Sequence, residues 1–235
     1  MTPQWQDGTV IHIVDETKDT RRFWIKTKDI FDFVPGQFIT MLLPIHEEHN
    51  KCWRSYSIAS SPDNSDTFEL IVVLDPNGKG SSYLFNSISV GSIITFKGPM
   101  GVFVLKEPLP DNLIFICTGT GIAPFRSMIN HIKNNNIPHK NIHLIFGCRT
   151  KDNILYHDEM NNINMDGFTY SPTLSRETWD GLNGYVHNIY EPIYTNNQPA
   201  KFYICGWKGM IDEARNKIIN LGYTKKDIHV EVYGQ

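Results

Sequence analysis

Hydrophobic and polar residues alternate over short stretches in roughly the first hundred residues of the chain. These stretches have the period of a half-buried strand, and turn residues such as Pro-Gly and Asn-Gly pairs separate them. One short helix is predicted at 81–88, because the serines after Gly80 are good helix caps. Short strands with little helix between them are typical of an antiparallel barrel or sandwich. The predicted strands are 10–14, 22–26, 37–43, 55–59, 68–74 and 93–97.

After Pro108 the pattern changes to apolar runs that are followed by helical spacing. Alternation of this kind builds a parallel sheet with helices on its faces. We therefore predict a two-domain β + α/β protein. A six-stranded antiparallel Greek-key β-barrel is expected at 1–106, and a five-stranded parallel α/β nucleotide-binding domain at 107–235. The strands located by pattern in the second domain are 113–117, 142–146, 202–205 and 228–233, and the helices are 124–133, 156–160 and 209–221.

Composition excludes several classes of protein. A chain of 235 residues with 40% hydrophobic residues can build ordinary cores, and a net charge of −3 argues against binding to nucleic acid. No apolar run reaches the ~20 residues of a membrane helix, and the first residues do not have the pattern of a signal peptide. The cysteines lie singly, which predicts neither a metal site nor an iron–sulfur centre and favours a cytoplasmic location. They are Cys52, Cys117, Cys148 and Cys205.

The first candidate site combines one strand with a helix start. In a strand, Arg54 and Tyr56 share one face while Ser57 takes the other. Arginine binds phosphate with a bidentate fork, and tyrosine offers a flat surface. Glycines before the serines of 80–82 suit an anion at a helix N-terminus. On local grounds, an ordinary amphipathic strand and a glycine-rich loop with a helix cap explain these residues equally well.

The second candidate site follows the strand at 113–117. The segment Thr-Gly-Thr-Gly-Ile-Ala-Pro at 118–124 reads as strand, glycine turn and helix, which places a pyrophosphate at a helix N-terminus. Pro124 stands where the dinucleotide fingerprint has its third glycine, and the next strand ends in Arg149 rather than in an acid. This pattern predicts a nucleotide site that accepts an extra phosphate. Cys205 and Gly206 lie at the carboxyl end of another parallel strand, where such sheets bind ligands.

Read in order, these motifs resemble the ferredoxin–NADP⁺ reductase family over nearly the whole chain. The motifs are Arg-x-Tyr-Ser, Gly-x-x-Ser, Gly-Thr-Gly-Ile-Ala-Pro, Cys-Gly-x-x-x-Met and a C-terminal Glu-Val-Tyr. The resemblance implies a flavoprotein oxidoreductase in which an FAD-binding barrel precedes an NAD(P)-binding domain. It implies hydride transfer between NADPH and FAD, and transfer of single electrons between FAD and a ferredoxin or flavodoxin.

The resemblance also implies roles around the flavin. Arg54 is expected to hold the FAD pyrophosphate together with Gly80, Ser81 and Ser82. Tyr56 is expected against the isoalloxazine ring. Ser57 is expected to hydrogen-bond N5 of the flavin, the atom that accepts hydride.

Around the nicotinamide nucleotide, the resemblance implies contacts from the glycine turn and from the chain's last strand. The residues expected to line the ribose and pyrophosphate are Thr118, Gly119, Gly121 and Pro124. Cys205 and Gly206 are expected to contact the nicotinamide. Tyr233 is expected to stack on the other face of the flavin, and Glu231 to lie beside Ser57. Unlike family members that end in tyrosine, this chain continues with Gly234 and Gln235.

The choice between NADPH and NADH depends on the ribose 2′-phosphate. Ser175 and Arg176 match the hydroxyl and arginine that NADPH-using members place there, Arg149 is a second cation, and Tyr185 is expected to cover the adenine. These residues favour NADPH, and the neighbouring Glu177 keeps NADH open. The alternatives are an NADH-dependent reductase component for an oxygenase or cytochrome, a reductase of free flavin, and a noncatalytic nucleotide-sensing subunit.

Overall fold

The structure is a computed structural model that describes residues 3–195 and 198–233. The chain folds into two compact units. The barrel unit comprises Met1–Val104 and Arg126–His131, and the α/β unit comprises Leu105–Phe125 and Ile132–Gln235. No helix among the described residues is long and apolar enough to cross a membrane.

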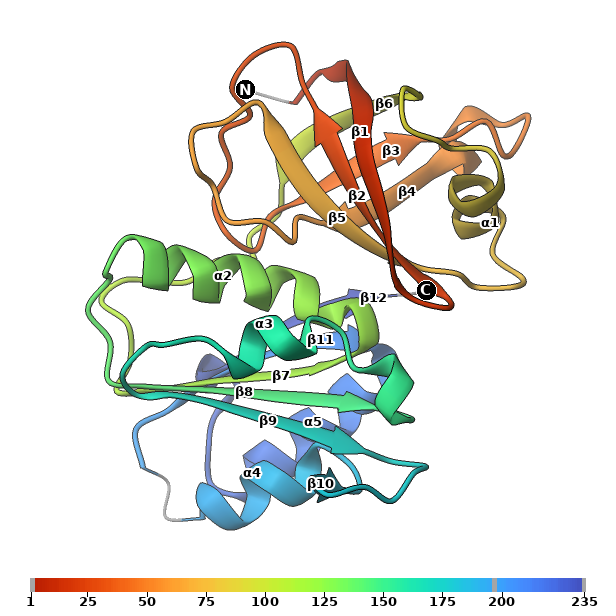
Figure 1. The fold of residues 1–235 in the computed structure, drawn as a ribbon. Coiled ribbons are helices and arrows are strands. Elements are labelled where there is room, and N and C mark those ends of the chain that lie inside the picture. The colour runs from red at the N-terminus through yellow and green to blue at the C-terminus, as the bar shows by residue number, and fades with distance from the viewer. Residues whose placement is uncertain (1–2, 196–197, 234–235) are drawn as a thin grey trace. The chain divides into compact units, whose positions relative to one another are not determined.

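The barrel unit contains one antiparallel sheet with the strand order β4-β3-β6-β1-β2-β5 (Figure 1). The prediction of an antiparallel, six-stranded first half is thus confirmed. The edge strands β4 and β5 meet at an isolated bridge between Ile58 and Leu70, so the barrel is only partly closed. Its elements are β1 (Trp5–Thr17), β2 (Thr20–Lys26), β3 (Phe38–Leu42), η1 (His49–Cys52), β4 (Trp53–Ser57), β5 (Thr67–Val73), α1 (Lys79–Asn86) and β6 (Ile93–Met100).

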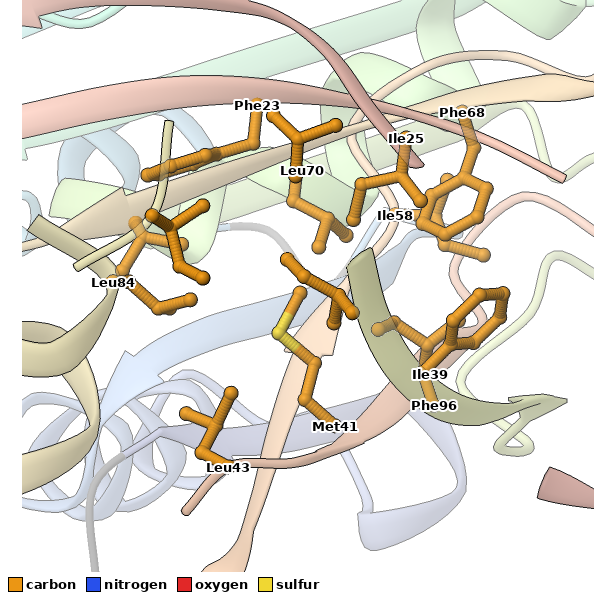
Figure 2. Close-up of a cluster of buried hydrophobic side chains, with 14 of the residues drawn as sticks. Phe23, Ile25, Ile39, Met41, Leu43, Ile58, Phe68, Leu70, Leu84 and Phe96 are labelled. Carbon is orange, nitrogen blue, oxygen red and sulfur yellow. The ribbon is translucent and has the colours of Figure 1, made fainter. Parts of the chain in front are cut away.

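Apolar side chains from the strands and from α1 form one core in this unit (Figure 2). Aromatic rings contribute much of it, with the Phe31 and Phe68 centroids 4.6 Å apart and the Phe68 and Phe96 centroids 5.3 Å apart. Leu84 of α1 is 1% exposed within the same core. Because burial of a leucine side chain is worth about 2 kcal/mol, this contact fixes α1 to the barrel.

The α/β unit contains a parallel sheet with the order β10-β9-β8-β7-β11-β12. Five of these strands are long, and β10 adds two residues at one edge. Its strands are β7 (Asn112–Thr118), β8 (Asn141–Cys148), β9 (Phe168–Leu174), β10 (Leu182–Asn183), β11 (Lys201–Trp207) and β12 (Ile228–Tyr233). The helices of this half of the chain are η2 (Gly119–Ile122), α2 (Ala123–Asn134), η3 (Lys151–Asn153), α3 (His157–Asn161), α4 (His187–Ile193), α5 (Lys208–Asn220) and η4 (Lys225–Asp227).

Strand β9 and helix α4, like the two-residue strand β10, were not located from the sequence. Strand β9 carries Pro172 and mostly half-buried residues, so it lacks the apolar run that marks β7 and β8. Helix α4 has seven residues and includes Pro192, which removes a helical donor. It is retained because Tyr190 is fully buried and packs its ring edge-on against Phe202. Tertiary packing therefore outweighs local propensity in both elements.

Parallel pairing brings the carboxyl ends of the strands to one edge of the sheet. Thr118 pairs with Gly147, and Cys205 pairs with both Cys117 and Glu231. The core beneath holds this register, since Phe202 of β11 is fully buried with the ring of Tyr223 4.8 Å away. The edge at which α/β sheets bind ligands is therefore formed here by the ends of β7, β8, β9, β11 and β12.

Candidate functional site

The residues of strand β4 face in the directions that their alternation predicts. Arg54 pairs with Met41 and Tyr56 pairs with Ile39, and both partners belong to the barrel core. Arg54 and Tyr56 therefore project from the core-facing side of β4, and Ser57 projects from the opposite side. Burial raises the pKa of Tyr56 to about 12, against a smaller lowering by the Arg54 charge, so its phenol stays neutral.

Arg54 lies against the first turn of α1. A Cβ atom at Gly80 would come within 2.8 Å of Cγ of Arg54, so a larger residue there would force the arginine side chain to shift. The Arg54 guanidinium donates through Nη1 to the carbonyl oxygens of Lys51 and Trp53, at 3.1 and 2.7 Å. These bonds fix the position of its charge beside the helix start.

The start of α1 presents backbone donors next to that charge. The N–H of Ser82 makes a helical hydrogen bond to the carbonyl of Gly78 at 3.0 Å, and the N–H groups of residues 79–81 precede it in the first turn. A guanidinium beside such donors fits a phosphate group, both electrostatically and by hydrogen bonding. The arrangement therefore fits the pyrophosphate of FAD. We call Arg54, Tyr56, Ser57 and 80–82 the flavin half-site.

The two serines at the start of α1, Ser81 and Ser82, differ in what their hydroxyls do. The Ser81 hydroxyl accepts the N–H of Asp75 at 3.0 Å and lies 3.2 Å from the carbonyl oxygens of Asp75 and Gly78. It therefore closes the loop before α1, and Ser81 is left to offer its backbone N–H. The Ser82 hydroxyl makes no hydrogen bond to another described residue. Asp75 was not singled out from the sequence, although Asp-Pro-Asn-Gly is a recognisable turn.

In the α/β unit, the glycine turn between β7 and α2 depends on two glycines for different reasons. Gly119 has φ +52°, a left-handed conformation that favours glycine. Gly121 has no room for a side chain, because a Cβ atom there would overlap the carbonyl oxygen of Cys205. The turn therefore lies directly on the end of β11. Pro124 occupies the second position of α2, within the first turn as predicted.

The structure brings Cys205, Glu231 and Tyr233 together at the ends of β11 and β12. The Cys205 sulfur lies 4.0 Å from Oε2 of Glu231. Burial and then the Glu231 charge raise the pKa of the Cys205 thiol, while a hydrogen bond with Tyr233 lowers it by less. The net shift is upward, so the thiol is protonated near neutral pH and is a poor nucleophile. Such a group suits packing against a ligand ring.

The residues that were expected to select the nucleotide lie at the ends of β8 and β9. The N–H of Arg176 donates to the carbonyl of Arg149 at 3.0 Å, which holds the two arginines on adjacent backbones. Ser175 donates through both its N–H and its hydroxyl to the carbonyl of Cys148, at 3.0 and 3.2 Å. Within the described part of the chain, no ion pair involves Arg149 or Arg176. The carboxylate of Glu177 instead accepts the N–H of Lys151 at 2.7 Å.

Tyr185 lies just beyond β10, ten residues after Ser175 in the sequence. Its neighbour Gly184 donates to the carbonyl of Leu174 at 2.8 Å and accepts the hydroxyl of Thr173 at 3.0 Å. The Tyr185 ring is 67% exposed, which leaves a face open for a planar base. We call the group at this edge of the sheet the nucleotide half-site. It comprises Thr118, Gly119, Gly121, Pro124, Arg149, Ser175, Arg176, Tyr185, Cys205, Gly206, Glu231 and Tyr233.

The two half-sites belong to different units, and each is assembled within its own unit. The expected neighbourhood of Glu231 and Ser57, and the stacking of Tyr233 on the flavin, join the two units and stay predictions. The tail residues Gly234 and Gln235 lie outside the described residues.

Two family models match the chain, one in each half. Residues 7–105 match the oxidoreductase FAD-binding domain, and residues 115–216 match the oxidoreductase NAD-binding domain. Among curated proteins, ferredoxin–NADP reductase B of Sorangium cellulosum is 34% identical over 86% of this chain and 86% of its own length. The anthranilate 1,2-dioxygenase electron transfer component of Acinetobacter baylyi is 31% identical over 78% of this chain, but the match covers 53% of its own length.

Solved structures share the fold. A ferredoxin–NADP⁺ reductase from Neisseria gonorrhoeae with bound FAD and NADP superposes with a TM-score of 0.83 and 24% identity. The match covers 97% of this chain and 98% of that one. An Amycolatopsis cytochrome P450 reductase superposes with a TM-score of 0.87 and 23% identity, over 99% of this chain and 71% of its own.

Proposed function

The chain belongs to the ferredoxin–NADP⁺ reductase-like flavoproteins and is an FAD-dependent NAD(P)H oxidoreductase, and from this premise we propose that it prefers NADPH and exchanges electrons with a ferredoxin or flavodoxin. FAD, when bound, supplies the chemistry that links two-electron hydride transfer to transfer of single electrons. The residues of the chain hold that group, orient the nucleotide and keep water out.

The presence of Arg149 and Arg176 at the neighbouring ends of β8 and β9 is the observation that carries the preference for NADPH. The backbones of the two residues are hydrogen-bonded, so this edge of the sheet carries two cationic side chains, which suits a 2′-phosphate. An acid that bound the ribose diol of NADH would have to face the same place. The nearest acid, Glu177, is occupied by the Lys151 N–H instead.

In the flavin half-site, each residue has a separate task. Arg54 and the first turn of α1 bind the pyrophosphate, and neutral Tyr56 offers its ring to the flavin without adding charge. Ser57 is 4% exposed, so its hydroxyl orients a ring nitrogen in a site that excludes bulk water.

In the nucleotide half-site, the glycine turn and the strand ends position the nicotinamide nucleotide. The turn at Gly119 and Gly121 receives the pyrophosphate, and Cys205 and Gly206 place the ring. The protonated Cys205 thiol adds no charge next to a nicotinamide that gains or loses charge. That Tyr233 stacks on the flavin and yields to the nucleotide stays an expectation from the family resemblance.

A small redox protein as acceptor is supported by the chain and by the names of its relatives. The cysteine spacing of the given sequence does not predict an iron–sulfur centre that would take the electrons from the flavin, which favours a separate redox protein as acceptor. One relative is named as a ferredoxin–NADP reductase, and others as electron transfer components of oxygenases. The chain spans 53–66% of the length of three relatives, the anthranilate 1,2-dioxygenase component, a flavohemoprotein and a glycine betaine monooxygenase reductase subunit, which contain further sequence that this chain does not match.

Anaerobic reduction of the bound flavin tests the nucleotide preference. We expect NADPH to bleach the flavin absorbance with a higher kcat/KM than NADH. Loss of a charge-assisted hydrogen bond costs about 1.5–3 kcal/mol, so Arg176→Gln and Arg149→Gln should each raise the KM for NADPH about tenfold or more. The KM for NADH should stay within about twofold, because NADH lacks the phosphate. The control is Lys201→Gln, whose ion pair with Asp227 lies at the opposite end of β11.

A wild-type protein that favours NADH would contradict the preference for NADPH and support the reductase component of an oxygenase or cytochrome. A second arm adds a ferredoxin or a flavodoxin to the NADPH-reduced protein. Turnover with ferricyanide but with neither protein would contradict the acceptor and leave the nucleotide assignment intact. A chain that binds nucleotide but never oxidises it would be a noncatalytic subunit.

A further inference from the structure

The C-terminal end of α1 is held by a charged residue from a distant strand. Arg21 of β2 donates through Nη1 to the carbonyl oxygen of Phe85 at 2.8 Å. Its guanidinium carbon lies 4.6 Å from the centre of the Phe85 ring. Asp15 of β1 fixes the guanidinium from the other side, with 2.6 Å between its Oδ1 and Nε of Arg21. One side chain thus contacts both the backbone and the ring of the same helical residue.

This contact has the form of a helix cap that comes from outside the helix. The last carbonyls of a helix have no partner within it, and a positive charge at that end complements the helix dipole. The N–H of Ser87 ends the helix by donating to Tyr83. Arg21 then supplies the donor and the charge for Phe85. Its side chain is 28% exposed, so the interaction is partly shielded from solvent.

The opposite end of the same helix is the phosphate-binding turn of the flavin half-site. An eight-residue helix spans roughly 12 Å and moves as one rigid piece, so a shift at its C-terminal end displaces its first turn. Leu84 anchors the middle of the helix in the core, which leaves rotation about that point to be restrained at the ends. At the first turn, Gly80 already lies against Arg54 with no free space.

We propose that Arg21 is a positioning residue for FAD, which acts through Phe85 and α1 to hold residues 79–82 in place for the pyrophosphate. The inference rests on the proposed role of Arg54 and the α1 start as the pyrophosphate site. It adds a residue that lies outside the flavin half-site and that no sequence motif marks.

The test compares flavins with and without phosphate. The full chain is stripped of FAD, and the dissociation constants for FAD and for riboflavin are measured by flavin fluorescence. We expect Arg21→Gln to weaken FAD binding about tenfold, or about 1.4 kcal/mol, because the phosphate-binding turn is no longer fixed. Riboflavin affinity should stay within about twofold, since riboflavin lacks the group that the turn binds. Arg21→Lys keeps the cation near Phe85 and should restore part of the FAD affinity.

Two controls separate this effect from general destabilisation. Lys26→Gln removes a positive charge from the far end of the same strand, where Lys26 pairs with Asp66, and should leave both affinities unchanged. Asp15→Asn weakens the ion pair that holds the Arg21 guanidinium but leaves Arg21 in place. It should therefore lower FAD affinity, by less than Arg21→Gln does. Asp15 is 69% exposed, which makes this variant safe for folding.

The outcomes distinguish the inference from its premise. Equal losses of FAD and riboflavin affinity in Arg21→Gln would overturn the inference, because a merely structural role affects both ligands. Unchanged FAD affinity would also overturn it. If the wild-type protein binds riboflavin as tightly as FAD, then residues 79–82 and Arg54 do not bind the pyrophosphate. That result would contradict the proposed function, on which the role of Arg21 depends.

Discussion

Burial keeps several titratable side chains of this protein in their neutral forms. Tyr56 in the flavin half-site and Cys205 in the nucleotide half-site both have raised pKa values, and burial is the main cause in each. A neutral phenol and a neutral thiol can touch a flat ring without an electrostatic penalty as charge moves through it. The same physical effect acts on His143 inside the sheet, with consequences for stability.

We expect the protein to lose stability in mild acid because His143 is buried in its neutral form. Its ring lies between Ser171 Oγ and Tyr194 Oη, at 2.9 and 3.3 Å, and burial lowers its pKa to about 4. In the unfolded chain the histidine takes up its proton near pH 6.5, before the folded one does. The stability that its neutral form contributes is therefore fully present above about pH 6.5 and is lost as the pH falls through about 4.

The expected size of this loss is about 3 kcal/mol between those pH values, from the difference between the two pKa values. Urea unfolding of wild type and of His143→Gln, at about pH 7.5 and about pH 4.5, measures it. The glutamine variant keeps a hydrogen-bonding side chain and does not titrate, so its stability should decline less. Identical declines in the two proteins would show that His143 is not the group responsible.

At the scale of elements, each half-site depends on a short helix or turn that packs against a neighbouring strand. In the barrel unit, α1 is seated by Leu84 and Arg21. In the α/β unit, η2 is seated on the carboxyl end of β11 through Gly121. In both cases a glycine allows the backbone that binds phosphate to come close to its neighbour.

Gly121→Ala tests the seating of the turn on β11. The added Cβ would overlap a backbone oxygen, which cannot move away as a flexible side chain would, so η2 has to shift. We expect a loss of about 3 kcal/mol in the free energy of unfolding, at the upper end for overpacking. The matched variant is Gly119→Ala, where a Cβ meets nothing within 4 Å and only the left-handed backbone is strained, for about 1 kcal/mol.

Urea unfolding measures both variants, and the KM for NADPH reports on the nucleotide half-site. Gly121→Ala should also raise that KM, because the turn moves relative to Cys205. A Gly121→Ala protein that is as stable as Gly119→Ala would mean that the turn is not seated on β11 as the structure has it.

At the scale of the whole molecule, the chain combines two units that each bind one part of the redox system. The FAD-binding model matches the first part of the chain and the NAD-binding model matches the second. The predicted boundary after residue 106 and the cytoplasmic location stay predictions. Because the flavin half-site lies within the barrel unit alone, removal of FAD should destabilise the barrel unit first.

Removal of FAD should therefore loosen the barrel unit selectively. A ligand that binds only the folded state adds about 2.7 kcal/mol at a concentration of 100 times its Kd. Amide hydrogen exchange of the protein with and without FAD measures where this protection is lost. We expect faster exchange at 75–82 and 53–57 in the stripped protein, and unchanged exchange in β8. Loss of protection in β8 as well would show that the effect of FAD is not confined to the barrel unit.

Much of this organisation follows from local pattern. The period-two stretches predict the barrel strands, and the change to strand–helix alternation predicts the parallel sheet, because each period matches the burial of one face. Boundaries were less accurate. Strand β1 runs from Trp5 to Thr17, well beyond the predicted 10–14, because it pairs with both β2 and β6 and so retains polar residues that no pattern marks.

The sequence by itself determined the architecture, the order of the motifs and the candidate residues of both half-sites, since these depend on neighbours along the chain. Only the tertiary structure decided what those residues contact. In the structure the Ser81 hydroxyl accepts a hydrogen bond from Asp75 in its own loop, and the Glu177 carboxylate accepts one from the Lys151 N–H. Arg21 donates to the carbonyl of Phe85, which lies 64 positions away. Such contacts join residues whose separation along the chain carries no signal, because packing in three dimensions alone brings them within hydrogen-bonding distance.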